Sequence, residues 1–288
     1  MRRATRSVAV DAVAPYASDV AQTSPVPSDK TSSRLARGHV VLDRVAKTFL
    51  AKDGSVEALR EISLDIAERE FVTLIGPSGC GKSTLLRIIG GLIDASAGSV
   101  AIRGRSPQDA QRTKDIGFVF QQPALLPWRT VAHNIELPFE LNKGSGTDRL
   151  CSTEEILALV GLSQFASAHP YQLSGGMQQR VAIARALIFD PALLLMDEPF
   201  GALDEITRAG MRYELLRIWG QSQKTVLFVT HSIPEAIVLS DRVVVMSPRP
   251  GEVREVLDIR LPRPRNEEIE STPEFVRLAD RLRHLLRA

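Results

Sequence analysis

Cysteine is nearly absent from the sequence, which holds two cysteines, Cys80 and Cys151, among its 288 residues. Two thiols provide no disulfide framework and suit a reducing cytoplasm, so the sequence does not resemble the disulfide-rich secreted proteins. Long apolar runs are missing as well. The longest, such as residues 192–196, are strand-sized, whereas a membrane-spanning helix needs about 20 residues. Any membrane role must therefore come through a partner.

A strong charge of one sign is also missing, because the net charge is only +2. Nucleic-acid binding usually requires a concentrated basic face, so the sequence predicts no nucleic-acid partner. The chain is 44% hydrophobic and 24% charged, which is typical of a soluble globular protein. Its length suits one large α/β domain or a domain with a smaller inserted one. No internal repeat is present, so the chain holds one copy of its functional unit.

The pattern of apolar segments divides the chain into three parts. Residues 1–36 are rich in Ser, Ala, Pro and Thr without periodicity, which predicts a disordered N-terminal arm. Residues 37–250 carry the strand and helix patterns of an α/β domain, with a helical insertion over about 123–186. Residues 251–288 form a C-terminal tail. Fully apolar runs within the domain favour parallel strands covered by helices on both faces. These runs are residues 193–196, 226–229 and 243–246, and residues 71–75 form a further compact strand that is apolar except for Thr73.

Residues 76–83 fit the phosphate-loop pattern G-x-x-x-x-G-K-[ST], between a predicted strand and a predicted helix. The glycines let backbone N–H groups turn toward a polyphosphate, and the helix N-terminus adds its positive end. Lys82 can reach the β- and γ-phosphates, and the Ser83 hydroxyl can hold Mg²⁺. A ligand-free turn, the alternative, would not need three glycines and a Lys-Ser pair. The predicted ATP-binding residues here are Gly76, Pro77, Ser78, Gly79, Cys80, Gly81, Lys82, Ser83 and Thr84.

Two acids, Asp197 and Glu198, directly follow the apolar run 193–196. Taken alone, an Asp-Glu pair after a strand is often a solvated turn. Next to a phosphate loop, the first acid typically holds Mg²⁺ from the far side. The second can accept a proton from the attacking water. The pair is therefore predicted to be catalytic.

A second helix N-terminus begins at the sequence Leu-Ser-Gly-Gly-Met-Gln-Gln-Arg. Ser174 is a natural N-cap, and Gly175 and Gly176 leave backbone N–H groups uncovered, so this is either a second anion site or an ordinary capped helix. The segment resembles the ABC ATPase signature Leu-Ser-Gly-Gly-Gln. Its position after the phosphate loop and before the acid pair also matches that family. Met177 departs from that signature at its last position.

This resemblance covers residues 38–250 and implies roles for further side chains. Phe49 takes the place of the aromatic residue that stacks on adenine, with a buried core phenylalanine as the alternative. Gln121 matches the glutamine that senses Mg²⁺ and the attacking water. His231 matches the switch histidine that contacts the γ-phosphate, although a lone histidine at a strand end is more often structural. Asp204 lies in the loop that links the two ATP sites.

The resemblance also implies the fold and the assembly. The expected fold is an α/β phosphate-loop NTPase core with a mostly parallel sheet, an antiparallel β subdomain and an inserted α-helical subdomain. Two chains would sandwich two molecules of ATP with Mg²⁺, so the active form is expected to be a homodimer. The residues expected to act on the partner's ATP are Ser174, Gly175, Gly176 and Asp204. The expected catalytic residues are Glu198, His231 and Gln121, and the expected Mg²⁺ ligands are Ser83, Gln121 and Asp197.

Residues 125–135, 200–204 and 246–251 are similar to the nitrate, sulfonate and taurine importer group. This implies an ATP-hydrolysing subunit at the cytoplasmic face of the inner membrane. Its partners would be integral membrane permease subunits and, indirectly, an extracytoplasmic solute-binding protein. Trp128 would suit an interface anchor, or it packs only within the insertion.

Three other functions were weighed against the importer. A soluble ABC ATPase that acts on ribosomes or DNA usually has two cassettes or a very long coiled-coil insertion, and the sequence shows neither. A small-molecule kinase would need neither Ser174 nor His231. A degenerate, non-hydrolysing subunit is disfavoured because Lys82, Glu198 and His231 are all present.

The C-terminal tail ends in a predicted basic amphipathic helix that begins near residues 272–273. Its apolar side predicts docking on its own domain, with binding to a membrane surface as the alternative. The apolar residues are Phe275, Leu278, Leu282, Leu285 and Leu286.

Cys80 lies inside the phosphate loop, near a helix N-terminus that favours the thiolate. The sequence therefore suggests that thiol alkylation blocks ATPase activity and that bound Mg-ATP protects against it.

Overall fold

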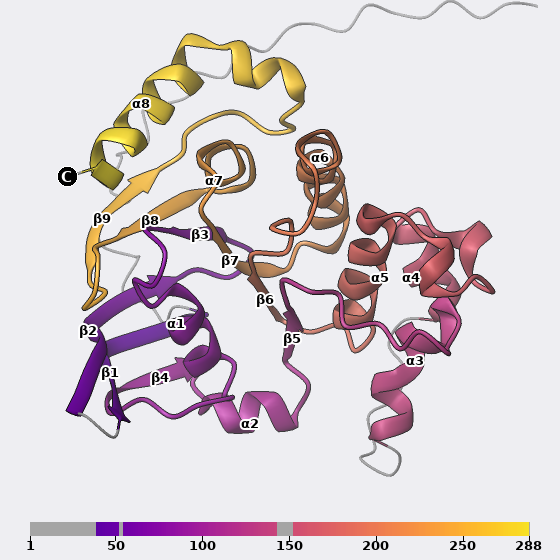
Figure 1. Cartoon of the computed structure of the whole chain (residues 1–288), viewed down its shortest axis with the longest axis horizontal. Helices are drawn as coiled ribbons and strands as arrows, with labels where there is room; N and C mark the ends of the chain where they lie inside the picture. The colour runs from indigo at the N-terminus through magenta and orange to yellow at the C-terminus, as the bar shows by residue number, and fades with distance from the viewer. Residues whose placement is uncertain (1–38, 52–53, 143–151, 288) are drawn as a thin grey trace, which may run out of the picture. The chain divides into compact units, whose positions relative to one another are not determined.

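The computed structural model describes residues 39–51, 54–142 and 152–287, as two sheets with helices around them (Figure 1). The predicted disordered arm, residues 1–36, and Cys151 lie outside the described residues.

The larger sheet has six strands, and all of its neighbouring strands are parallel except the last pair. This arrangement confirms the mostly parallel sheet expected from the fully apolar runs. In spatial order the strands are β5 (Ile116–Val119), β6 (Leu193–Asp197), β7 (Thr225–Thr230), β3 (Phe71–Ile75), β8 (Arg242–Met246) and β9 (Val253–Asp258).

Both faces of this sheet are buried, and β7 shows how. Val226 and Phe228 pack into one hydrophobic core, and Leu227 and Val229 pack into the other. Because side chains alternate along a strand, a strand covered on both faces needs apolar residues at every position. The absence of polar alternation in the sequence is thus explained by the two cores.

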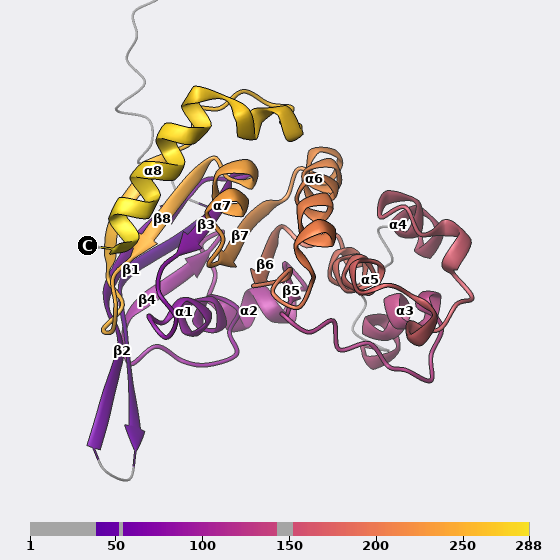
Figure 2. The ribbon, with the colours of Figure 1, turned by 45° about the horizontal axis from the view of Figure 1, so that its top comes forward.

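The smaller sheet is antiparallel and has the order β2 (Gly54–Ile66), β1 (Val40–Ala51) and β4 (Ala97–Ile102). Its inner face packs with α1 (Lys82–Ile89) on one side of the larger sheet. The far half of the β1–β2 hairpin extends beyond β4 (Figure 2). The expected antiparallel β part is therefore present.

The chain between β5 and β6 is helical over the region in which an insertion is predicted. Its three α-helices all begin at a Ser or Thr whose side chain accepts a hydrogen bond from the third backbone N–H that follows. Such caps satisfy N–H groups that have no partner within the helix. The helices are α3 (Val131–Leu141), α4 (Thr153–Leu159) and α5 (Gly175–Leu187), and a separate short helix, α2 (Pro107–Arg112), precedes β5.

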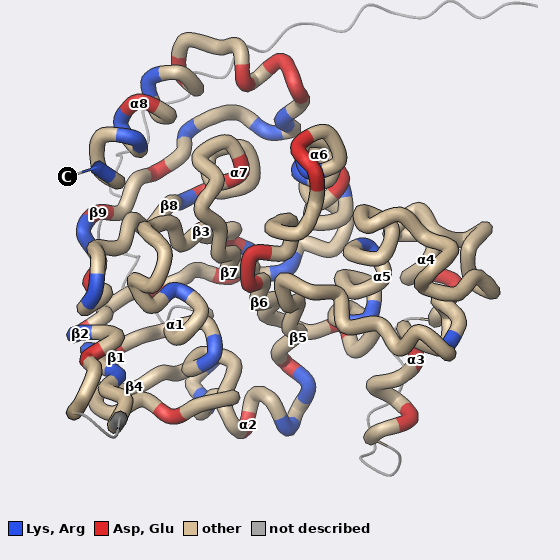
Figure 3. Tube along the Cα trace, in the orientation of Figure 1, with Lys and Arg blue, Asp and Glu red and all other residues tan. Residues whose placement is uncertain are grey.

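The remaining helices are α6 (Glu205–Ser222), α7 (Ile233–Leu239) and α8 (Pro273–Arg287), with a short 3₁₀ helix, η3 (Glu267–Ser271), before α8. The apolar side of α8 packs into a core shared with α7, β8 and β9. Arginines and acidic residues are interspersed along its other side (Figure 3). The ion pairs made by this side are Arg277–Glu274, Arg281–Glu255 and Arg283–Asp280.

We expect Leu282→Ala to lower the free energy of unfolding by about 2–4 kcal/mol, because Leu282 is fully buried and its loss leaves a cavity. Val276→Ala on the same helix is the matched control. Val276 is 48% exposed, so the change should stay within about 0.5 kcal/mol. Urea unfolding followed by circular dichroism measures both. Equal effects in the two variants would contradict the packing of α8 on the domain.

Candidate active site

The phosphate loop connects the end of β3 to the start of α1. Gly81 adopts a φ of 99°, and a Cβ at this position would lie 2.6 Å from Leu59 Cδ2, so only glycine fits. No side chain caps the helix that follows. Its first N–H groups are therefore left for an anion, which the positive end of the helix also attracts.

Lys82 is buried within this loop. Its ammonium group donates hydrogen bonds to the carbonyl oxygens of Gly76 at 2.8 Å and Pro77 at 3.0 Å. An ammonium group has three N–H donors. Two of them fix the side chain in the loop, and the third donates to Cys80 Sγ at 3.7 Å, a weak hydrogen bond that a phosphate oxygen can replace.

A cavity of about 310 Å³ opens over the loop. Phe49 lies at one side of it, 41% exposed, with Lys47 Nζ 5.1 Å from the centre of its ring. The alternative that Phe49 is a core residue is therefore wrong. An aromatic face on one side and an anion-binding loop on the other suit a nucleotide. The cavity is lined by Phe49, Val56, Ala58, Ser78, Gly79, Gly81, Lys82, Ser83, Thr84, Glu198 and Arg249.

Two of the three expected Mg²⁺ ligands lie together. The Ser83 hydroxyl donates a hydrogen bond of 2.7 Å to Asp197 Oδ1. Asp197 is buried, and this burial raises the pKa of its carboxyl above the ordinary value. Mg²⁺ prefers hard oxygen ligands and usually binds through one or two protein groups plus phosphate oxygens, so this pair fits it. No cluster of three or more His, Cys, Asp or Glu able to hold a metal occurs in the described part of the chain.

Gln121 does not join this pair. It follows β5 as an exposed residue, and its amide nitrogen would lie 2.9 Å from a Cβ placed on Gly201. It does not line the cavity over the loop. The structure thus places the Gln121 amide beside Gly201, in the segment that follows Glu198.

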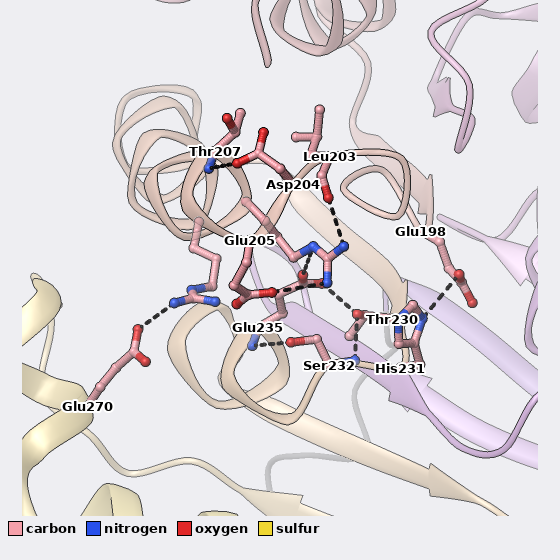
Figure 4. Close-up of polar contacts among 12 residues, drawn as sticks. Glu198, Leu203, Asp204, Glu205, Thr207, Thr230, His231, Ser232, Glu235 and Glu270 are labelled. Carbon is pink, nitrogen blue, oxygen red and sulfur yellow. Dashed lines mark hydrogen bonds and ion pairs between the residues drawn. The ribbon is translucent and has the colours of Figure 1, made fainter. Parts of the chain in front are cut away.

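Glu198 and His231 lie side by side at the ends of neighbouring strands, β6 and β7. Glu198 Oε2 is 3.3 Å from His231 Nδ1 (Figure 4). The backbone of Glu198 has a φ of 45°, which is unfavourable for a side chain larger than glycine. Its N–H group donates to Val229 O at 3.0 Å, which fixes this conformation. The strained backbone presents the carboxylate to the cavity, where a carboxylate can accept a proton from water.

The signature glycines pack against the start of α6. A Cβ on Gly175 would lie 3.2 Å from Leu203 Cδ2, and one on Gly176 would lie 2.9 Å from Thr207 Cγ2. Asp204 caps α6, and the hydrogen bond from the Thr207 N–H lowers the pKa of its carboxyl. None of the four residues expected to act on the partner's ATP lines the cavity over the loop. Of the two helix N-termini expected to bind phosphate, the one at the phosphate loop lies at this cavity and the one at Ser174 does not.

Comparison with known proteins decides the family. The ABC transporter family matches residues 59–201. The taurine import ATP-binding protein TauB of Rhizobium johnstonii is 45% identical over 85% of this chain and 95% of that protein. The aliphatic sulfonates import ATP-binding protein SsuB of Bacillus cereus is 46% identical, covering 82% and 92%. This chain belongs to the ABC transporter family.

Solved members of the ABC transporter family share its fold. A dimeric ATP-binding cassette in a post-hydrolysis state, bound to ADP and Pi, is 37% identical with a TM-score of 0.65. The match covers 77% of this chain and 99% of that one. A dimeric bacterial ABC transporter cassette is 38% identical, with the same TM-score and coverage.

Three cavity residues of this ABC transporter protein, Val56, Ala58 and Arg249, were not predicted from the sequence, and Arg249 is the charged one among them. It follows β8, which lies parallel to β3, so the loops after both strands meet at one edge of the sheet. Its Nη2 atom is 3.7 Å from the position of a Cβ on Gly79. The strand order was the missing signal, because Arg249 is far from the phosphate loop in sequence.

The structure contradicts the accessibility expected of Cys80. The thiol is 1% exposed, and its sulfur accepts a hydrogen bond from Lys82 Nζ at 3.7 Å. Alkylation requires an exposed thiolate, so a rapid block of this site by thiol reagents is no longer expected.

We expect Arg249→Ala to weaken Mg-ATP binding about tenfold, the effect of losing one hydrogen bond to a charged group. Arg249→Lys should bind at an intermediate level, because it keeps the charge and loses the planar fork. Titration with a fluorescent ATP analogue measures both.

Arg260→Ala is the control for this test, since Arg260 is exposed on the surface and does not line the cavity. Its affinity should match the wild type. If Arg249→Ala bound ATP as well as the control, Arg249 would have no part in nucleotide binding.

Proposed function

We propose that the chain binds Mg-ATP over the phosphate loop and hydrolyses it as the ATP-binding subunit of an importer. The observation that carries this is the cavity, which brings together an aromatic face, a buried lysine, the hydroxyl of the Ser83–Asp197 pair and the carboxylate of Glu198. Phosphoryl transfer to water requires positioning of the substrate, neutralisation of charge and a proton acceptor, and these groups can provide all three.

Each side chain has a separate task in this mechanism. Phe49 stacks on the base, and Lys82 together with the loop N–H groups holds the phosphates. Mg²⁺, held by Ser83 and Asp197, neutralises charge on the phosphate oxygens when it is bound. Glu198 accepts the proton of the attacking water, and His231 positions that carboxylate and meets the γ-phosphate.

Gln121 completes the site as a Mg²⁺ and water sensor only after it has moved from its place against Gly201. Closure on nucleotide supplies such a movement in many enzymes.

We propose a homodimer as the active form. Ser174, Gly175, Gly176 and Asp204 lie away from the chain's own cavity, so they can reach a bound ATP only in a second copy. The dimeric assembly of the solved cassettes supports this arrangement. ATP bound between two copies stabilises the closed dimer, and hydrolysis removes that stabilisation.

We propose import of small anionic or sulfur- or nitrogen-containing solutes, of the aliphatic sulfonate, taurine or nitrate type, with membrane permease subunits as partners. The names of the relatives TauB and SsuB support this class. No helix in the described ranges is long and apolar enough to cross a membrane. The chain would act peripherally, at the cytoplasmic face of the inner membrane. A solute-binding protein would be an indirect partner, and no nucleic acid would take part.

The helical region between β5 and β6 offers a surface for a permease. Trp128 is 71% exposed, so the alternative that it only packs within this region is wrong. Leu141 and Tyr171 are exposed in the same region. Exposed large apolar side chains of this kind favour a partner interface.

We expect Glu198→Gln to reduce ATP turnover at least about 100-fold, because the amide cannot accept the proton. ATP affinity should stay within about threefold, since the side chain keeps its shape and hydrogen bonds. Phosphate release and nucleotide titration measure the two quantities, and light scattering should show a dimer that persists with ATP. Glu154→Gln, an exposed acid on α4, is the control. Normal turnover in Glu198→Gln would remove Glu198 from this role.

The importer is tested separately by purifying the Glu198→Gln chain from membranes of its host and identifying what accompanies it by mass spectrometry. We expect a polytopic permease, retained because the variant remains bound to ATP. Recovery of ribosomes, DNA-repair factors or no membrane protein would instead favour a soluble ABC ATPase with a non-membrane partner.

A further inference from the structure

A buried carboxylate, Glu235 on α7, lies beneath the site and has no role in the mechanism above. Its side chain is only 4% exposed. Burial raises the pKa of this carboxyl, while Thr230 and two arginines, Arg208 and Arg212, act in the opposite direction. A buried acid costs free energy unless groups around it compensate the charge, so its neighbours indicate what it does.

On one side, Glu235 holds the turn that carries His231. The Thr230 hydroxyl donates a hydrogen bond of 2.5 Å to Glu235 Oε2 and accepts one of 2.9 Å from the Ser232 N–H (Figure 4). Ser232 in turn caps α7 by accepting a hydrogen bond from the Glu235 N–H. The residues on both sides of His231 are thus fixed through Glu235.

On the other side, Glu235 faces Arg208 on α6. Arg208 Nη2 donates to Leu203 O at 2.9 Å, next to Asp204, and its Nη1 pairs with the exposed Glu205 at 3.4 Å. Arg208 therefore holds the loop that is expected to face the second ATP site. Glu235 and Arg208 are the link between this loop and the His231 turn.

The contact between Glu235 and Arg208 is incomplete. Arg208 Nε is 4.0 Å from Glu235 Oε1, and in the described part of the chain this buried nitrogen has no hydrogen-bond partner. A charge-assisted hydrogen bond is about 2.7–2.9 Å long, so a shift of about 1 Å would complete it. Completing it would satisfy a buried donor whose lack of a partner is unfavourable. The pair can thus adopt an open and a closed arrangement.

Arg212 supplies the second cation near Glu235, but it is committed elsewhere. It pairs with Glu270 of η3 at 2.9 Å, and the Tyr213 hydroxyl donates to the same carboxylate at 2.6 Å. Arg212 is held by the C-terminal segment, and Arg208 is held by the loop at Leu203. Of these two arginines, Arg208 is the one that binds the loop at Leu203, so a movement of that loop would reach Glu235 through Arg208.

We propose that Glu235 and Arg208 are a pair of positioning residues that couples the Leu203–Asp204 loop to the His231 turn. The inference rests on the proposed function, in which the loop contacts the ATP site of the partner and His231 acts in the site of its own chain. When the dimer closes on ATP, the loop moves Arg208 onto Glu235. The completed contact then fixes Thr230 and Ser232, so that His231 and Glu198 are aligned in one site when the other is occupied.

The test is a double-mutant cycle in the full chain, with Glu235→Gln, Arg208→Gln and the two combined. Glu235→Gln keeps an acceptor for the Thr230 hydroxyl and removes the charge. We expect each single variant to lower kcat about tenfold, the size of a typical coupling between sites. KM for ATP should stay within about twofold, and the Hill coefficient for ATP should fall toward 1. The combined variant should be no slower than either single one, because the two residues act as a unit.

Glu205→Gln is the matched control, since it removes the exposed partner of Arg208 and leaves Glu235 in place. It should hydrolyse ATP at the wild-type rate and with the wild-type Hill coefficient. Glu235→Asp keeps the charge on a shorter side chain and should recover part of the lost rate. If the glutamine variants do not fold, Glu235→Asp tests the proposal in their place. Thermal unfolding of every variant is measured alongside.

Two results would overturn the proposed coupling. One is a combined variant whose loss of rate equals the product of the two single losses, and the other is a normal rate and Hill coefficient per folded molecule in Glu235→Gln. A wild-type chain and a Glu205→Gln control that both fail to hydrolyse ATP would instead overturn the proposed function, because the pair is intact in both.

Discussion

The whole site depends on the parallel hydrogen bonding of four central strands. Because β6, β7, β3 and β8 run in one direction, their carboxyl ends meet at one edge of the sheet. That edge receives Asp197, Thr230, Gly76 and Ser247 from segments distant in sequence. The phosphate loop after β3 supplies donors, a cation and one expected metal ligand, whereas the second metal ligand, Asp197, and the carboxylate of Glu198 come from the end of β6. The two apolar cores that cover the sheet keep this edge rigid, so that these functional groups stay in position.

The same edge concentrates features that do not favour stability. Asp197 and Glu235 are buried acids whose burial raises their pKa values. Glu198 adopts a strained backbone conformation, which costs on the order of 1–3 kcal/mol. Such costs persist only where the surrounding structure over-determines them, and they gather at functional sites. Here the compensating contacts come from neighbouring strands and from helices, as in the hydrogen bonds from the Glu198 N–H to Val229 O and from the Ser83 hydroxyl to Asp197.

Much of this arrangement was predictable from local sequence. The apolar run before Asp197 predicts a strand buried on both faces, and Ser174 predicts a helix start, because each depends on neighbouring residues only. The positions that could not be predicted depend on long-range packing. Arg249 reaches the phosphate loop because β8 lies next to β3, Cys80 is buried by that same crowding, and Gln121 lies against Gly201 rather than at the metal pair. Sequence spacing alone does not encode such proximities.

The packing of the signature helix explains why its glycines serve more than anion binding. Gly175 and Gly176 let α5 approach Leu203 and Thr207 closely, because a Cβ would lie 3.2 Å from Leu203 Cδ2 at the first position and 2.9 Å from Thr207 Cγ2 at the second. The helix end and the loop before α6 therefore form one packed unit, and densely packed groups move together rather than independently. Arg208 continues that unit by binding Leu203 O. Under the proposed function, a partner's ATP that binds at the helix end would also act on the loop, and through Arg208 and Glu235 on the turn that carries His231. The proposed coupling would thus connect two parts of the chain that serve different nucleotides.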